Sequence, residues 1–175
     1  MKKEELSALL QHNHAQFIQL TEQLTDADFC FAPNGKWSAG QQLDHLVKSV
    51  SPVYMAMGLP KFIPKLLFGT ANRPSKSYEG LVEKYTLKLK EGGRATGRFV
   101  PKEVVAAQKK DLVKQLSLLV KKLCIKTERQ TEEGLDTFIL PHPLLGKLTF
   151  REMLFFTAYH AEHHRQLVLR GLENR

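Results

Sequence analysis

Apolar residues recur every three or four positions in four long segments, and this spacing is typical of helices that bury one face. The segments span residues 3–24, 38–52, 101–124 and 149–171. No stretch of comparable strength alternates with the period of a strand. Four such segments can bury their apolar faces only against one another, so we predict an all-α fold, a four-helix bundle. The length fits a single domain over residues 1–175.

Polar residues mark where two of these helices begin. Ser38 with Gln41, and Thr149 with Glu152, have the spacing of a capping box, in which two side chains bind free backbone N–H groups. Pro52 cannot donate a backbone hydrogen bond, so we expect the second helix to kink or end there.

Proline and glycine interrupt residues 58–97, which we predict to form a long crossover connection between the second and third helices. Short helices are expected at 61–68 and 78–91. The third helix would then begin near Pro101, which suits a first helical turn.

Positive charge is concentrated in this connection. Residues 60–100 carry nine Lys/Arg and three acids, whereas the whole chain has a formal net charge of +8. A solvated connection is the simplest interpretation, and an anionic cosubstrate is the alternative. No motif combines aromatic and basic residues as nucleic-acid sites do, so we expect no nucleic-acid partner.

Several features indicate a cytoplasmic protein without a membrane partner. Cys30 and Cys124 stand far apart and form no CxxC motif, so no disulfide framework is expected. The first residues do not resemble a signal peptide. The longest apolar run, residues 153–159, is far shorter than the ~20 residues that span a bilayer.

Three histidines are crowded into the last predicted helix. Each helical residue advances by about 100°, which places His160 and His164 in the middle of the apolar stripe. His163 lies at the edge of that stripe, and Glu162 points the opposite way. Buried imidazoles need partners for their nitrogens, since an unpaired polar group costs a few kcal/mol. A divalent metal ion would bind both neutral rings; hydrogen-bonded core histidines without metal are the alternative.

A third ligand has to come from another helix, and His45 is the best candidate. On the second helix it shares a small polar face with Ser38, Gln41, Gln42 and Ser49, as in the wall of a pocket. A partly exposed polar face is the alternative.

Other polar residues receive weaker predictions. Asn13, Gln41 and Ser49 are candidates for orienting a substrate. His12 and His14 are expected to point away from the stripe of the first helix, and His142, between two prolines, is expected to be a loop residue.

Three stretches resemble the DinB/YfiT-like family. Residues 36–46 (KWSAGQQLDHL) are similar to its second-helix signature. Residues 142–149 (HPLLGKLT) resemble its entry into the last helix, and residues 159–167 (YHAEHHRQL) its last-helix motif. The resemblance covers the whole chain with the parts in the right order. It implies a four-helix bundle with a long link between helices two and three. It also implies nickel or zinc on His45, His160 and His164, and a homodimer, since relatives are often dimers.

These observations favour an enzyme acting on a small molecule. Three protein ligands are fewer than a closed structural zinc site uses, so positions remain for water or substrate. No carboxylate is predicted beside the histidines, which makes the metal-bound group the expected nucleophile. The first hypothesis is a transferase that joins a low-molecular-weight thiol to a small electrophile, as some relatives do. The alternatives are a metal-dependent hydrolase of a small amide or ester, and a non-catalytic stress-response bundle that binds metal or a partner.

Overall fold

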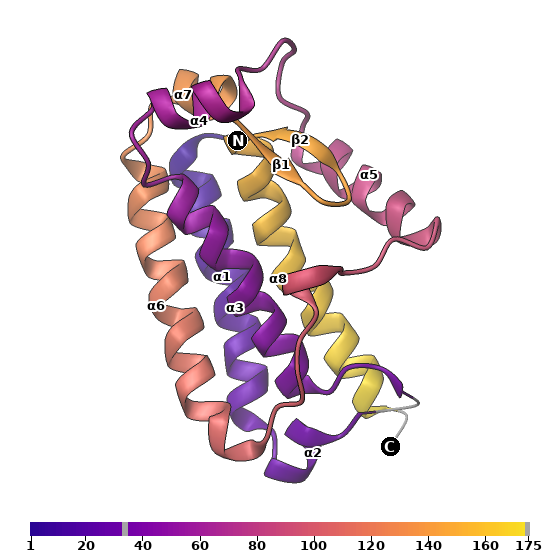
Figure 1. Cartoon of the computed structure of the whole chain (residues 1–175). Coiled ribbons are helices and arrows are strands. Elements are labelled where there is room, and N and C mark those ends of the chain that lie inside the picture. Colours follow the sequence, from indigo (N-terminus) through magenta and orange to yellow (C-terminus); the bar gives the residue numbers. More distant parts are fainter. Residues whose placement is uncertain (33–34, 174–175) are drawn as a thin grey trace.

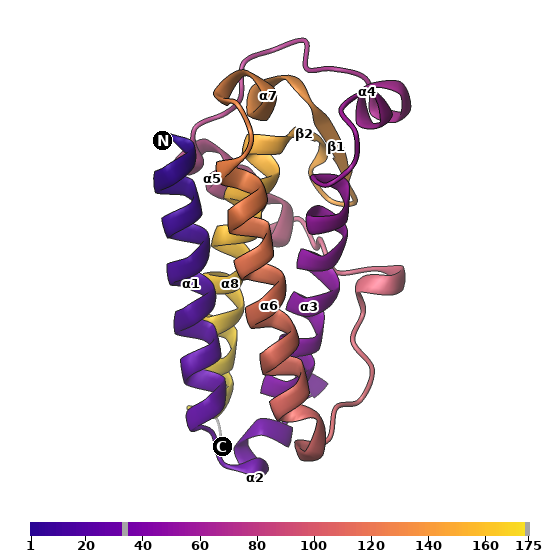
Figure 2. The same ribbon diagram turned by 90° about the vertical axis from the view of Figure 1, so that its left-hand side faces the viewer.

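Four long helices form the body of the molecule, in a computed structural model that describes residues 1–32 and 35–173. They are α1 (Lys3–Gln23), α3 (Ala39–Ala56), α6 (Lys109–Glu128) and α8 (Phe150–Leu172). Figures 1 and 2 show them side by side, with α1 packed against α6 and α8, and α3 packed against the same two helices. The predicted four-helix bundle is therefore confirmed.

The core is built from the apolar stripes of these helices. Large side chains from each helix are fully buried, among them Leu10, Phe17, Leu43, Leu116 and Leu154. Burial of such a side chain stabilises the fold by about 1.5–3 kcal/mol relative to its exposure.

Both predicted capping boxes are present. The Ser38 hydroxyl accepts the backbone N–H of Gln41, whose side chain accepts the N–H of Ser38. Thr149 and Glu152 make the same exchange at the start of α8.

Two helix limits differ from the prediction. α3 continues through Pro52 to Ala56, because Val50 and Val53 on either side are buried in the core and this packing outweighs the lost backbone hydrogen bond. α6 begins at Lys109, after the short 3-10 turn η3 (Ala106–Gln108), and not near Pro101. The Val104 side chain packs directly on Gly40 at the start of α3, since a Cβ added to Gly40 would lie only 3.0 Å from Cγ1 of Val104. This contact keeps the chain before α6 extended.

The crossover between α3 and α6 contains the two expected short helices, α4 (Phe62–Phe68) and α5 (Tyr78–Lys90), followed by the turn η2 (Gly97–Phe99). An ion pair between the exposed Arg73 of the crossover and the buried Glu152 connects it to the start of α8. Both carboxylate oxygens of Glu152, whose side chain is fully buried, accept hydrogen bonds from Arg73 at 2.6 and 2.9 Å. The backbone N–H of Lys76 donates to the same carboxylate.

The prediction of no strands was wrong. A two-stranded antiparallel hairpin, β1 (Ile139–His142) and β2 (Gly146–Thr149), precedes α8. Its strands have four residues each and do not alternate between buried and exposed positions, so the sequence carries no strand period. The helix α7 (Glu132–Thr137) joins α6 to this hairpin, and the small helix α2 (Asp26–Cys30) follows α1.

Both cysteines are free, as expected, with Cys30 exposed and Cys124 buried. Within residues 1–32 and 35–173, no helix has the length and apolar character needed to cross a bilayer.

Candidate metal centre

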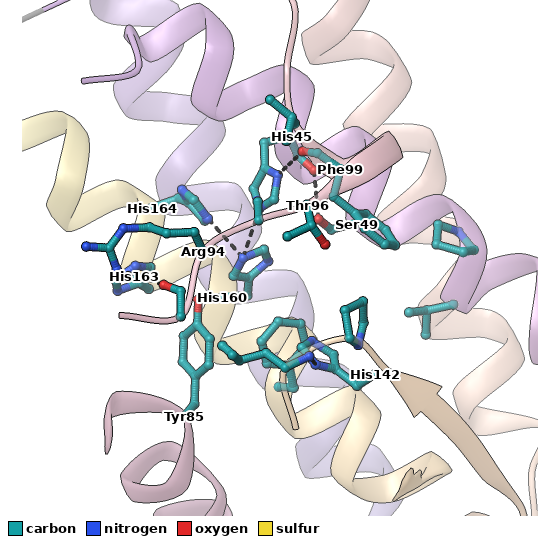
Figure 3. A pocket seen from close by; sticks show the side chains of 18 of the residues that line it. His45, Ser49, Tyr85, Arg94, Thr96, Phe99, His142, His160, His163 and His164 are labelled. Carbon is teal, nitrogen blue, oxygen red and sulfur yellow. Dashed lines mark hydrogen bonds between the residues drawn. The ribbon is translucent and has the colours of Figure 1, made fainter. Parts of the chain in front are cut away.

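Three imidazole rings meet at one point between α3 and α8. His45 comes from α3, and His160 and His164 come from successive turns of α8 (Figure 3). The Nε2 atom of His160 lies 3.2 Å from Nε2 of His45 and 2.9 Å from Nε2 of His164. All three residues are buried. The structure thus brings together the three histidines that the sequence singled out.

Hydrogen bonds on the far side of two rings fix which nitrogen faces this point. Nδ1 of His45 lies 2.6 Å from the carbonyl oxygen of Phe99, and Nδ1 of His164 contacts the side-chain oxygen of Gln42. Because both partners are acceptors, each Nδ1 carries the proton. Each Nε2 therefore presents a lone pair to the common point.

Burial also keeps the rings neutral. Desolvation lowers the pKa of His45, and it lowers the pKa values of His160 and His164 well below the usual value. Mutual repulsion adds to this effect, since a charge on His164 or His45 lowers the pKa of His160 further. Neutral imidazole is the form that binds metals.

The donor set fits a divalent ion. Lone pairs that converge at about 3 Å repel one another unless a proton or a cation lies between them. Tetrahedral coordination with Zn–N bonds of 2.0–2.1 Å separates neighbouring nitrogens by about 3.3 Å. The two distances from His160, 3.2 and 2.9 Å, are close to this value, and all three ligand atoms lie within 4.8 Å of one another. In the described part of the chain, no other group of three potential ligands lies so close together. Glu162 is bonded to Arg165 and Gln166 and contributes nothing to this group.

The three rings open onto a cavity of about 1300 Å³. Residues of the segment 93–100, which follows α5, also line this cavity, and we call this segment the strap. The strap passes close to the hairpin, because a Cβ on Gly93 would lie only 2.6 Å from a methyl group of Leu144. Only glycine allows this approach without a shift of one of the two.

Tyr85 of α5 lines the same cavity and faces the histidines (Figure 3). Its ring centroid lies 6.1 Å from that of His160 and 5.6 Å from that of His163. Although the residue is buried, its hydroxyl forms no hydrogen bond with any described residue. Burial raises the pKa of this hydroxyl, so it stays protonated and can donate to a bound molecule.

The three predicted substrate-orienting residues have different positions. Ser49 lines the cavity, and its hydroxyl donates to the carbonyl of His45. Asn13 and Gln41 do not line it. Asn13 is buried in the bundle, where it donates to the carbonyl of Ala158, and Gln41 is used in the helix cap. The structure does not support a substrate contact for these two.

The other histidines correct or refine the sequence prediction. His14, predicted to point away from the apolar stripe of α1, is nevertheless buried, being 1% exposed, and its Nδ1 is hydrogen-bonded to the carbonyl of Leu10. His142 belongs to β1, and its Nδ1 accepts the N–H groups of Leu144 and Leu145. His12 is exposed and His163 half-buried, as expected.

Sequence reasoning missed three supports of the site. Gln42 was only assigned to a polar face, although its place one turn before His45 could have indicated a role. The carbonyl of Phe99 belongs to the backbone, so the residue type at this position does not indicate its role. Tyr85 reaches the site only through the path of the crossover.

Comparisons with known proteins concern the family and the fold of this chain. The family model of the DinB superfamily matches residues 9–168. YfiT from Bacillus subtilis, described as "a probable metal-dependent hydrolase with an unusual four-helix bundle topology", has a similar structure, with a TM-score of 0.63 and 20% identity. The match covers 98% of this chain and 86% of YfiT. At this identity the likeness shows the fold. No curated protein sequence matches significantly.

Proposed function

This chain belongs to the DinB superfamily, and we propose that it is a metal-dependent enzyme whose ion is held by His45, His160 and His164. The observation that carries the proposal is the convergence of three neutral Nε2 atoms beside a large cavity. Nickel or zinc suits three imidazoles. Three ligands leave room for a further group on the cavity side, as in catalytic sites.

The preferred reaction is transfer of a low-molecular-weight thiol to an electrophile. A bound divalent ion would lower the pKa of a thiol that it holds and so supply a nucleophile at neutral pH. In the reaction a sulfur–carbon bond forms, the leaving group departs with its electron pair, and the thiol proton passes to solvent.

Charge around the cavity supports this choice. Among the described residues that line it, Glu173 is the one acid, and it follows the end of α8. No carboxylate is therefore placed beside the histidines as a general base. Basic residues line the same cavity, namely Lys36, Arg94, Arg98 and Arg170. Their field would attract a thiol cosubstrate that carries carboxylates.

The residues around the centre have separate tasks. The Phe99 carbonyl and Gln42 hold the rings of His45 and His164 in the binding orientation. Such outer hydrogen bonds commonly contribute tenfold to hundredfold in metal affinity. The Tyr85 hydroxyl would donate a hydrogen bond to the electrophile or to its leaving group.

A hydrolase of a small amide or ester is the second candidate. It is favoured by the description of YfiT as a metal-dependent hydrolase and by the Tyr85 hydroxyl, which could donate to a carbonyl oxygen. In this case water would replace the thiol as the nucleophile.

The two reactions differ in their need for a thiol. Metal-loaded protein is incubated with an electrophile, with and without an anionic thiol, and consumption of the electrophile is measured. Consumption only with thiol, lost in His160→Ala, supports transfer. Consumption of an ester or amide without thiol supports hydrolysis. No turnover across a broad panel at full metal occupancy would overturn both and favour a non-catalytic metal-binding bundle.

A further inference from the structure

The cavity is larger than a small electrophile and a thiol require. Its volume of about 1300 Å³ exceeds the 300–1,000 Å³ of most small-molecule sites. The lining residues also divide by chemistry. The charged ones come from the approach to α3, from the strap and from the end of α8, whereas none comes from the second half of α3, from α4 or from the hairpin.

We call the uncharged part the apolar chamber, and it extends from the histidines toward α4 and the hairpin. Residues of four elements line it, including Val53, Ala56, Leu67, Leu140, Leu144 and Met153. Figure 1 shows α4 and the hairpin at the same end of the bundle. An apolar wall with few polar groups is suited to aliphatic chains.

The polar groups in this part have partners within the protein. The Ser49 hydroxyl donates to the His45 carbonyl at 2.8 Å. His142 uses Nδ1 to accept two backbone N–H groups, and its ring packs on Phe156 with centroids 4.3 Å apart. Polar substituents on a bound chain would therefore find few hydrogen-bonding partners in the chamber.

The length of the chamber follows from α3. His45 faces the centre, and Ala56, eleven residues on, is the last residue of α3 and also lines the cavity. At about 1.5 Å per helical residue the two are about 16 Å apart, the length of an extended chain of roughly a dozen carbon atoms.

We propose that the apolar chamber binds an unbranched aliphatic chain, so that the electrophile is a long-chain molecule whose reactive end lies at the histidines. The inference rests on the proposed function for the reaction at that end, but chain binding can be measured without any reaction.

The test uses straight-chain alcohols, which carry no charge and do not require the basic residues. Dissociation constants are measured by calorimetry on the whole chain, with and without zinc. Each added methylene should tighten binding about fourfold, and the gain should stop at roughly a dozen carbons, where the chamber ends. The binding heat capacity should become more negative over the same range.

Substitution of Ala56 tests whether the end of α3 sets the chain length at which the gain in affinity stops. Ala56→Trp should stop the gain about three or four carbons earlier, and the smaller Ala56→Leu about two carbons earlier. Leu66→Ala is the matched control, because Leu66 is 83% exposed on α4 and does not line the cavity. It should leave the chain-length dependence unchanged. Circular dichroism verifies that each variant is folded.

Affinity that is independent of chain length would overturn the proposal, as would an unchanged limit in both folded Ala56 variants. These results are separate from those on the reaction. Chain-length-dependent binding without turnover would leave the chamber assigned and remove the proposed function. Turnover of small electrophiles with no chain-length dependence would do the reverse.

Discussion

Replacement of Gln42 by leucine tests how the ring of His164 is held. The side-chain oxygen of Gln42 accepts the Nδ1 proton of His164, and both residues are about 5% exposed or less. Leucine has nearly the same size but accepts no hydrogen bond. The imidazole would then lose the interaction that fixes its tautomer and its orientation.

The expected loss can be worked out from this contact. Water has little access to a site so buried, so the unpaired N–H costs about 1–3 kcal/mol. Because 1.4 kcal/mol corresponds to a factor of ten, zinc affinity should fall about tenfold to hundredfold, the range found for outer-shell partners of metal ligands. Gln42→Glu, which keeps the acceptor, should retain most of the affinity.

The adjacent residue supplies a matched control. Gln41 lies on the same helix, but its side chain caps the helix start and makes no hydrogen bond with a histidine in the described part of the chain. Gln41→Leu should lower the free energy of unfolding by up to about 1 kcal/mol and leave zinc affinity unchanged. Affinities are measured by competition with a chromogenic chelator. Equal losses of affinity in the two leucine variants would refute the assigned role of Gln42.

Two further predictions concern stability. Arg73→Met should lower the free energy of unfolding by about 2 kcal/mol in urea titrations, because it leaves the buried Glu152 carboxylate with only backbone donors; an unchanged value would contradict the importance of this ion pair. Burial lowers the pKa of His14 to about 4, so only the unfolded chain binds this proton between pH 6.5 and 4. The free energy of unfolding therefore keeps the full contribution of the neutral His14 above pH 6.5. It falls by up to about 3 kcal/mol as the pH drops from 6.5 toward 4. His14→Leu should flatten that part of the pH profile of the melting temperature, and an unaltered slope would exclude His14 as its source.

Much of the site could be predicted because its residues belong to regular helices. The angular positions of His160 and His164 follow from the helical repeat once the apolar stripe is known. The capping box at Ser38 fixes where α3 begins. The polar face of the same helix then indicates His45.

The remainder depends on contacts between distant segments. His14 is buried although it lies off the leucine stripe of α1, because neighbouring helices cover more of that helix than its apolar residues suggest. The late start of α6 follows from packing of Val104 on α3, which outweighs the preference of Pro101 for a first turn. The position of Tyr85 depends on the path of the crossover, which Arg73 and Glu152 fix through one ion pair.

The metal content of histidine variants tests the account most directly. The wild type and the His45→Ala, His160→Ala, His164→Ala and His163→Ala variants are purified without a histidine tag, loaded with zinc, dialysed and measured by mass spectrometry of the metal. We predict a single tightly held ion per chain in the wild type and in His163→Ala, and almost none in the other three. Equal retention by all folded variants, or equal loss from all four, would contradict a centre built from these three rings.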